Sequence, residues 1–217
     1  MKRRHLLRIA ALAGLGGVSG HIARVLAAGD LPPGLHRLEG KATVNGRPAK
    51  EGMPLQPGDR VATGAGSRAV VVLKGDALLL RSNTVVQIGG REGVLSEVLI
   101  ATGKGLSVFA KKPVAIRAGT ATIGIRGTGA YVEVEPGSVY FCLCYGEALV
   151  EGPGMAARQV KTTHHEEPLI LTEAGGIMKA APGPFRNHSD DELILLESLV
   201  GREPPFMAGG VYPAKKY

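Results

Sequence analysis

The chain of 217 residues contains no tryptophan and few other aromatic residues, so its core has to be built from Val, Ile, Leu and Ala. It has only two cysteines, too few for a metal signature of four cysteines. No apolar run approaches the roughly 20 residues that cross a membrane as a helix. The chain also shows no phosphate loop, no acid pair and no nucleophile beside its base, which argues against an enzyme.

The net charge of +7 is concentrated at the amino terminus. Residues 1–27 carry five basic residues and no acid, whereas the rest of the chain has 21 basic and 19 acidic residues. A nearly neutral body lacks the basic surface that phosphate recognition requires. We therefore expect no nucleic-acid partner.

Residues 1–27 have the three parts of an export signal. Met1–Arg8 is basic, Ile9–Gly20 is apolar, and small or aliphatic residues precede a cleavage point near Ala27. Arg3-Arg4 resembles the pair of a twin-arginine signal, a route that carries proteins across the membrane already folded. The sequence predicts a periplasmic protein that meets the membrane only through this signal, with an uncleaved anchor as the alternative.

The rest of the chain consists of short apolar runs divided by Gly and Pro, with no helical periodicity up to about residue 180. We expect an all-β body, built as a twisted sandwich or a short solenoid-like stack of hairpins, with one short C-terminal helix. The predicted segments are a linker at 28–39, a β-domain at 40–151, its C-terminal extension at 152–188, the helix at 189–201 and an extended tail at 202–217.

The helix is predicted from its two ends. Ser189–Glu192 is a capping box whose acids complement the helix dipole, and Gly201 follows the last apolar position. Between them Leu193, Leu196 and Val200 recur at helical spacing. In the tail, Phe206 and Tyr212 are expected to contact the body.

The clearest hairpin turns at Pro136-Gly137, a pair that suits a type II turn. A two-residue loop puts Val132 opposite Phe141 on an apolar face. The same register puts Gly129 opposite Cys144 on the other, more polar face. Both cysteines therefore lie on that second face.

Two glycine-containing motifs carry a family resemblance. Residues 121–134 read Ala-Thr-Ile-Gly-Ile-Arg-Gly-Thr-Gly-Ala-Tyr-Val-Glu-Val, and residues 55–64 read Leu-Gln-Pro-Gly-Asp-Arg-Val-Ala-Thr-Gly. Both are similar to motifs of the FecR domain, a periplasmic all-β module named for a regulator of ferric citrate uptake. The resemblance covers about residues 40–151, and it implies a role in interactions without common catalytic residues.

Cys142 and Cys144 are the best candidates for chemistry. Positions i and i+2 of a strand point the same way, so the two thiolates can bind one soft metal ion. His164 and His165, on a predicted later strand, would add imidazole and complete a Cys2His or Cys2His2 site for zinc, iron or copper. A vicinal disulfide, two buried free thiols and an intermolecular disulfide are the alternatives.

Two further patterns have simpler interpretations. His188-Ser189-Asp190 contains the residue types of a hydrolase triad, but contiguous residues do not face one another and capping explains Ser189 and Asp190. Arg126 is expected to pair inside the protein, with a residue such as Asp59 or Glu133, and the alternative is that it faces a carboxylate ligand.

We therefore expect an exported, non-enzymatic FecR-like module that binds an envelope protein or glycan. Since only a signal precedes the domain, a transmembrane anti-sigma role is not expected. A periplasmic metal-binding or redox protein that uses Cys142, Cys144, His164 and His165 is the alternative function.

Overall fold

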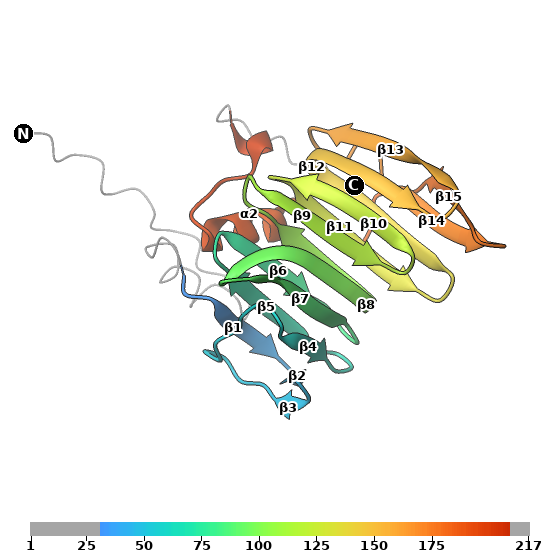
Figure 1. Ribbon diagram of the computed structural model, residues 1–217. Helices are drawn as coiled ribbons and strands as arrows, with labels where there is room; N and C mark the ends of the chain where they lie inside the picture. The colour runs from blue at the N-terminus through green and yellow to red at the C-terminus, as the bar shows by residue number, and fades with distance from the viewer. Residues whose placement is uncertain (1–30, 209–217) are drawn as a thin grey trace, which may run out of the picture.

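The computed structural model describes residues 31–208, so the export signal and residues 209–217 with Tyr212 lie outside the described residues. The described part has fifteen strands, one α-helix, α2 (Asp190–Leu199), and a 3-10 helix (Pro205–Met207) (Figure 1). Neither of these helices combines the length and apolar character that crossing a bilayer requires. The predicted all-β body with one short C-terminal helix is confirmed.

The strands form two sheets that share two long members. Along the first sheet the order is β1 (Gly34–Glu39), β5 (Arg68–Leu73), β6 (Asp76–Leu80), β8 (Val94–Val108), β11 (Gly129–Glu135), β12 (Ser138–Gly152), β14 (Leu169–Ala174) and β15 (Ile177–Pro182). Along the second it is β3 (Arg47–Pro48), β2 (Ala42–Val44), β4 (Arg60–Thr63), β7 (Val85–Arg91), β8, β9 (Pro113–Ala118), β10 (Ala121–Arg126), β12 and β13 (Met155–Thr162).

Strands β8 and β12, of 15 residues each, pass from one sheet into the other. The ring β8–β9–β10–β12–β11 closes back on β8 through paired neighbours, with β8 and β9 parallel and the other pairs antiparallel. A barrel of five strands therefore lies at the centre, and the remaining strands extend it on either side.

Each long strand changes sheet at a glycine with positive φ. In β8, Thr102 pairs in the second sheet and Gly103, with φ of 88°, pairs in the first. In β12 the change comes between Tyr145 and Gly146, with φ of 99°. Only glycine adopts such a conformation without strain, so these two residues fix where the barrel turns its corners.

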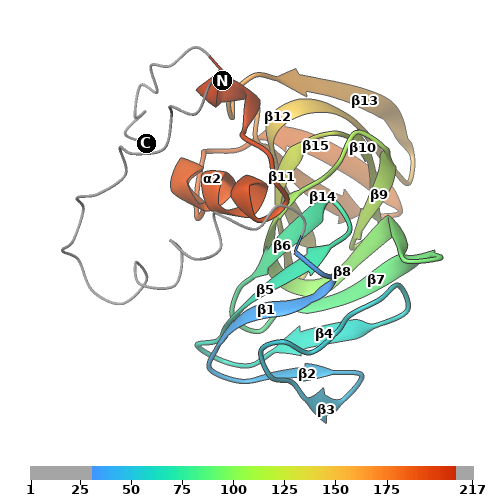
Figure 2. The same cartoon turned by 90° about the vertical axis from the view of Figure 1, so that its left-hand side faces the viewer.

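The two faces of the first sheet are covered by different cores. The face toward the second sheet holds the main cluster, which includes Val132 and Phe141. The opposite face holds a second cluster with Tyr131, Cys142 and Cys144, and α2 lies over it (Figure 2). The cysteine face, predicted to be the more polar one, is therefore buried too.

The hairpin register is confirmed over most of its length, with Val132 opposite Phe141. It is wrong at the end, because Gly129 lies opposite Tyr145 and a β-bulge leaves Cys144 without a direct partner on β11. A Cβ at Gly129 would lie 2.6 Å from the Tyr145 ring, so this pairing requires glycine.

Two predicted segment boundaries are also wrong. Residues 34–39, assigned to the linker, form β1 and pair with β5. Leu35 in this strand is fully buried, so the segment is part of the core. The described part of the tail is not wholly extended, since Pro205–Met207 forms a 3-10 turn that places Phe206 against Tyr145. A proline at the first position favours such a turn.

The corner at Gly103 can be tested by substitution. A Cβ there would lie 2.5 Å from the Cα of Thr84, so we expect Gly103→Ala to lower the free energy of unfolding by at least about 2 kcal/mol. Gly124→Ala is the control, because its nearest neighbour would be 3.9 Å away. Thermal melts that shift equally for both variants would show that the corner does not need glycine.

Candidate metal centre

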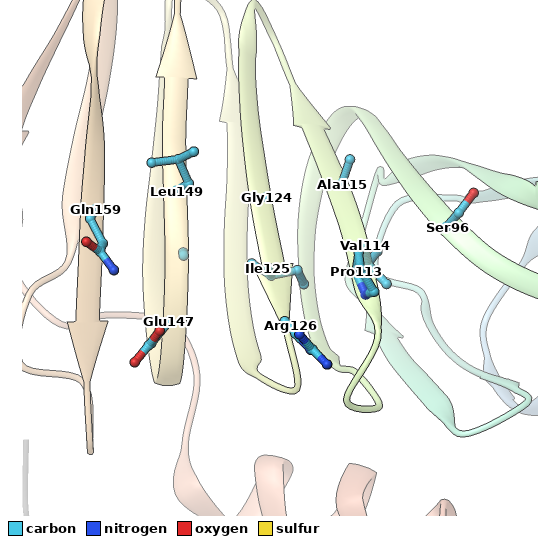
Figure 3. Close-up of a pocket in the computed structure, with 11 residues that line it drawn as sticks. Ser96, Pro113, Val114, Ala115, Gly124, Ile125, Arg126, Glu147, Leu149 and Gln159 are labelled. Carbon is cyan, nitrogen blue, oxygen red and sulfur yellow. The ribbon is translucent and has the colours of Figure 1, made fainter.

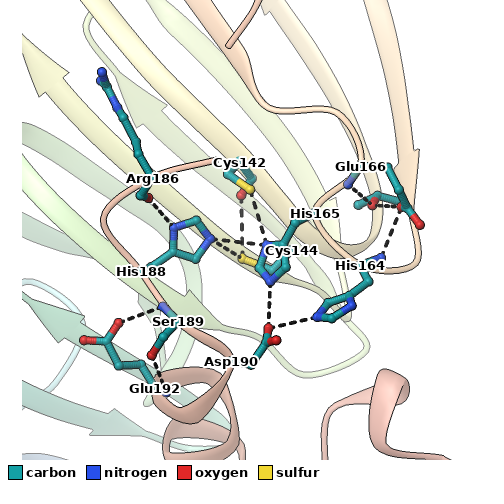
Figure 4. Close-up of polar contacts among 11 residues, drawn as sticks. Cys142, Cys144, His164, His165, Glu166, Arg186, His188, Ser189, Asp190 and Glu192 are labelled. Atoms are coloured by element: carbon teal, nitrogen blue, oxygen red, sulfur yellow. Dashed lines mark hydrogen bonds and ion pairs between the residues drawn. The ribbon is translucent and has the colours of Figure 1, made fainter. Parts of the chain in front are cut away.

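Four buried side chains from three segments meet beneath the amino end of α2 (Figure 4). Cys142 and Cys144 come from β12, His165 from the loop between β13 and β14, and His188 from the segment that leads into α2. One ligand atom from each residue lies within 4.8 Å of the others. The four atoms could therefore bind one ion together.

The two thiols share a face because of strand geometry. Cys142 and Cys144 are two residues apart in β12, so both side chains point away from the main core. Both cysteines are free thiols, and both are fully buried as members of the second cluster. The remaining ligands of the site have to come from segments that cover this face of the sheet.

His165 is set by a tight turn after β13. It has a φ of 58°, and its backbone N–H donates to the carbonyl of Cys144 at 3.1 Å. The Glu166 carboxylate accepts hydrogen bonds from Thr162, Thr163 and the His164 backbone. Although burial acts to raise it, these bonds lower the pKa of Glu166 to about 2, so the turn is held by a charged group.

His188 is set by the approach to α2. Its ring stacks on Tyr131 with centroids 4.5 Å apart, and the next residue, Ser189, caps the helix as predicted. Asp190, the first helical residue, is buried. The amino end of a helix favours a carboxylate, which stabilises Asp190 in this position.

The hydrogen bonds fix which ring nitrogens carry lone pairs. His188 Nδ1 lies 2.7 Å from the carbonyl oxygen of Arg186, which can only accept, so His188 Nε2 is the free nitrogen. His165 Nε2 lies 3.0 Å from the Asp190 carboxylate, which favours the proton on Nε2 and the lone pair on Nδ1. His165 Nδ1 and His188 Nε2 both face the cysteines. This is the arrangement in which outer carboxylates and carbonyls orient metal-binding histidines.

Three of the six distances among the four ligand atoms match a tetrahedron around one ion. Cys142 Sγ lies 3.5 Å from His165 Nδ1, Cys144 Sγ lies 3.6 Å from His188 Nε2, and the two nitrogens are 3.3 Å apart. Tetrahedral zinc, with bonds of about 2.3 Å to sulfur and about 2.05 Å to nitrogen, gives about 3.6 Å between S and N and about 3.3 Å between N and N. A metal ion between the two nitrogens, or a proton on one of them, removes the repulsion between their lone pairs.

The two thiols have opposite pKa shifts. A hydrogen bond with Cys144 is the largest influence on Cys142 and, against the opposing effect of burial, lowers the pKa of its thiol to about 6. Burial raises the pKa of Cys144 well above its usual value. One thiolate beside one thiol is therefore the favoured state of the pair, and a divalent cation would favour the second thiolate.

The structure places the four predicted ligands in two groups. Cys142, Cys144 and His165 lie together, but the His164 ring points to Asp190, with its Nε2 2.9 Å from the carboxylate. Adjacent residues project in different directions, which separates His164 from the thiols. The fourth member, His188, was assigned only to a rejected triad.

Neither His188 nor Asp190 stands out in the sequence, because each is 44 or more residues from the cysteines and belongs to no spaced motif. The capping box was the one available signal. It fixes the start of α2, and both residues lie within one position of its cap, Ser189.

A shallow groove lies on the far side of the molecule, across the outer face of β9, β10 and β12 (Figure 3). Its floor includes Ala115 and Gly124, and its rim includes Leu149, Arg126 and Glu147. It brings together no set of metal-binding or nucleophilic groups. We assign no chemistry to it.

The prediction that Arg126 pairs with Asp59 or Glu133 is wrong. Arg126 ends β10 with an exposed side chain and forms no ion pair within residues 31–208. Asp59 instead accepts from Asn45, and buried Glu133 pairs with Arg186 at 2.7 Å. The alternation of β10 turns residue 126 outward, away from both acids.

No protein-family model matches the chain, and no curated protein matches it in sequence. In fold it is similar to two crystal structures of a "putative anti-sigma factor" from Parabacteroides distasonis ATCC 8503, at 1.65 and 2.50 Å resolution. Both are 15% identical to it, with a TM-score of 0.48. The alignments cover 57% of this chain and 59% of the first structure, and 65% and 73% for the second. The chain thus spans about three fifths of the first structure.

Proposed function

We propose that this protein binds one zinc ion through Cys142, Cys144, His165 and His188, and that the ion has a structural role. The observation that carries the proposal is the spacing of the four ligand atoms, which all lie within 4.8 Å of one another. Two sulfur–nitrogen distances, 3.5 and 3.6 Å, and the nitrogen–nitrogen distance of 3.3 Å are those expected for tetrahedral coordination. Support comes from the outer acceptors, which give both histidines the required tautomer.

The ligand set favours zinc over the other metals considered. Two sulfurs and two nitrogens in a tetrahedron are typical of zinc or of iron–sulfur centres. An iron–sulfur cluster with two cysteines and two histidines binds each pair to a different iron. Sulfur–nitrogen distances of 3.5 and 3.6 Å suit one shared ion instead. Four protein ligands also leave no open position for a substrate.

The same residues resemble a Cys–His–Asp triad, formed by Cys142, His165 and Asp190. A nucleophile has to be reached by its substrate, however, and Cys142 is 0% exposed beneath the second cluster. The burial favours a metal ligand over a nucleophile. We therefore propose that the protein is not an enzyme.

Metal content provides the direct test. We expect about one zinc per chain in purified protein and less than a tenth of that in Cys142→Ser and His188→Ala, because each removes a ligand. His164→Ala should keep its zinc, since the His164 ring lies outside the sulfur–nitrogen set. Elemental analysis of the four proteins measures this. Metal-free wild-type protein with two titratable thiols would refute the proposal.

The role of Asp190 can be tested separately. Asp190→Asn weakens the acceptor that orients His165, so zinc affinity should fall about 10- to 100-fold in competition with a chromophoric chelator. Asp191→Asn is the matched control. This substitution removes the same charge one residue away, at a position that is exposed. Equal affinities of the two variants would mean that Asp190 does not position the ligand.

We further propose that the zinc-bound domain belongs to the FecR type, is periplasmic and acts as an interaction module for an envelope protein or glycan. The motif of residues 121–134 supports the assignment, since it makes up most of β10 and β11, two of the five barrel strands. Residues 1–27 support export.

The export route can be tested in cells. Replacing Arg3 and Arg4 together by lysine should hold the full-length protein in the cytoplasm, because the twin-arginine route requires that pair. Fractionation and immunoblotting would follow the loss of the shorter, cleaved form from the periplasm. A cleaved periplasmic product from the double variant would rule out this route.

A further inference from the structure

Helix α2 covers an apolar face that does not belong to the main core. The strand residues of this cluster are all buried, and they come from β5, β6 and β8: Val70, Val72, Ala77, Leu79, Leu106 and Val108. The helix contributes Leu193, Leu196 and Leu199 to the same cluster and packs on β6 and β8. Helix α2 therefore covers the β6 and β8 part of an apolar face. Figure 2 shows the helix beside this side of the sheet.

Polar contacts fasten α2 at both ends. At its amino end, Glu192 receives two hydrogen bonds from Arg81, at 2.7 and 2.9 Å, and the candidate centre begins with His188. At the other end, Arg202 donates to Glu197 at 2.6 Å and to the carbonyl of Gly75 at 2.6 Å. Two contacts tie the helix to β12: the Tyr145 hydroxyl donates to Glu197, and the candidate ligand His188 lies beside Cys144 just before the helix cap.

We propose that the face of β6 and β8 under α2 is a docking surface for an amphipathic helix of a partner protein, and that the bound metal keeps it closed. The inference rests on the zinc centre proposed above. While the ion is bound, α2 is held in place through His188. When the ion is lost, the helix can leave and a partner helix can take its position.

The chemistry of the partner follows from what α2 itself offers. It carries leucines at 193, 196 and 199 on one face and acids in its first turn. Without Glu192, the Arg81 guanidinium would remain at the rim near the Tyr131 ring, 5.7 Å from its centroid, with no carboxylate. An acidic first turn followed by an apolar stripe is therefore the complementary ligand.

The weakness of α2 on its own makes such control feasible. It has ten residues, fewer than the roughly 12–15 at which an isolated helix becomes even marginally stable in water. Its last turn has no basic residue to complement the dipole. The helix therefore depends on its tertiary contacts. One of these is made by the candidate ligand His188, the residue just before the helix cap Ser189.

A labelled peptide of residues 189–202, which contains none of the four ligands, is the probe. Fluorescence anisotropy would measure its binding to full-length protein loaded with zinc, to the same protein after chelation, and to zinc-loaded Leu193→Asp/Leu196→Asp. The double variant loosens the helix without changing any of the four ligand residues. We expect at least tenfold tighter binding to the second and third samples than to the first.

Arg81→Ala in the double variant should weaken binding about tenfold, whereas Arg126→Ala, on the far face, should change nothing.

Absence of binding to the double variant would overturn the docking surface. Binding to the double variant but not to the chelated protein, or equal binding before and after chelation, would overturn control by the metal. Elemental analysis of the same samples shows separately whether zinc is bound at all.

Discussion

The fold depends on two strands that belong to both sheets. Because β8 and β12 bend at Gly103 and Gly146, each contributes one half to either layer, and the ring of five strands can close. In its first half, β12 points one set of side chains into the barrel and the other set outward. That second set contains both cysteines, so barrel closure also decides where the candidate centre lies.

The outward face of β11 and β12 is buried by polar segments as well as apolar ones, and the buried charge on β11 is compensated. Glu133 is 1% exposed and binds Arg186, Lys104 and the Tyr131 hydroxyl. The proposed zinc ion with two thiolates and two neutral imidazoles would carry no net charge. Burying such a centre would avoid most of the cost of an isolated buried ion, so the proposed site is compatible with its position under a helix.

Short sequence patterns predicted the features that depend only on neighbouring residues. The period of two along a strand puts Cys142 and Cys144 on one face, and the capping box locates the start of α2 within one residue. The hairpin register follows from its two-residue turn and fails only at Gly129, where a bulge accommodates the bend of β12. Barrel closure was not predicted, because it depends on pairing between strands far apart in sequence.

The fourth candidate ligand, His188, could not be predicted from short sequence patterns. His188 enters the centre because α2 docks on β6 and β8, a tertiary contact that no periodicity in the chain encodes. His164 and His165 are adjacent in sequence, yet a single residue with positive φ, His165, sends one ring to the thiols and leaves the other on Asp190. Asp190 then accepts from both histidines. One carboxylate at the start of a short helix thus couples the position of that helix to the orientation of a ligand, and docking of α2 and completion of the centre become one event.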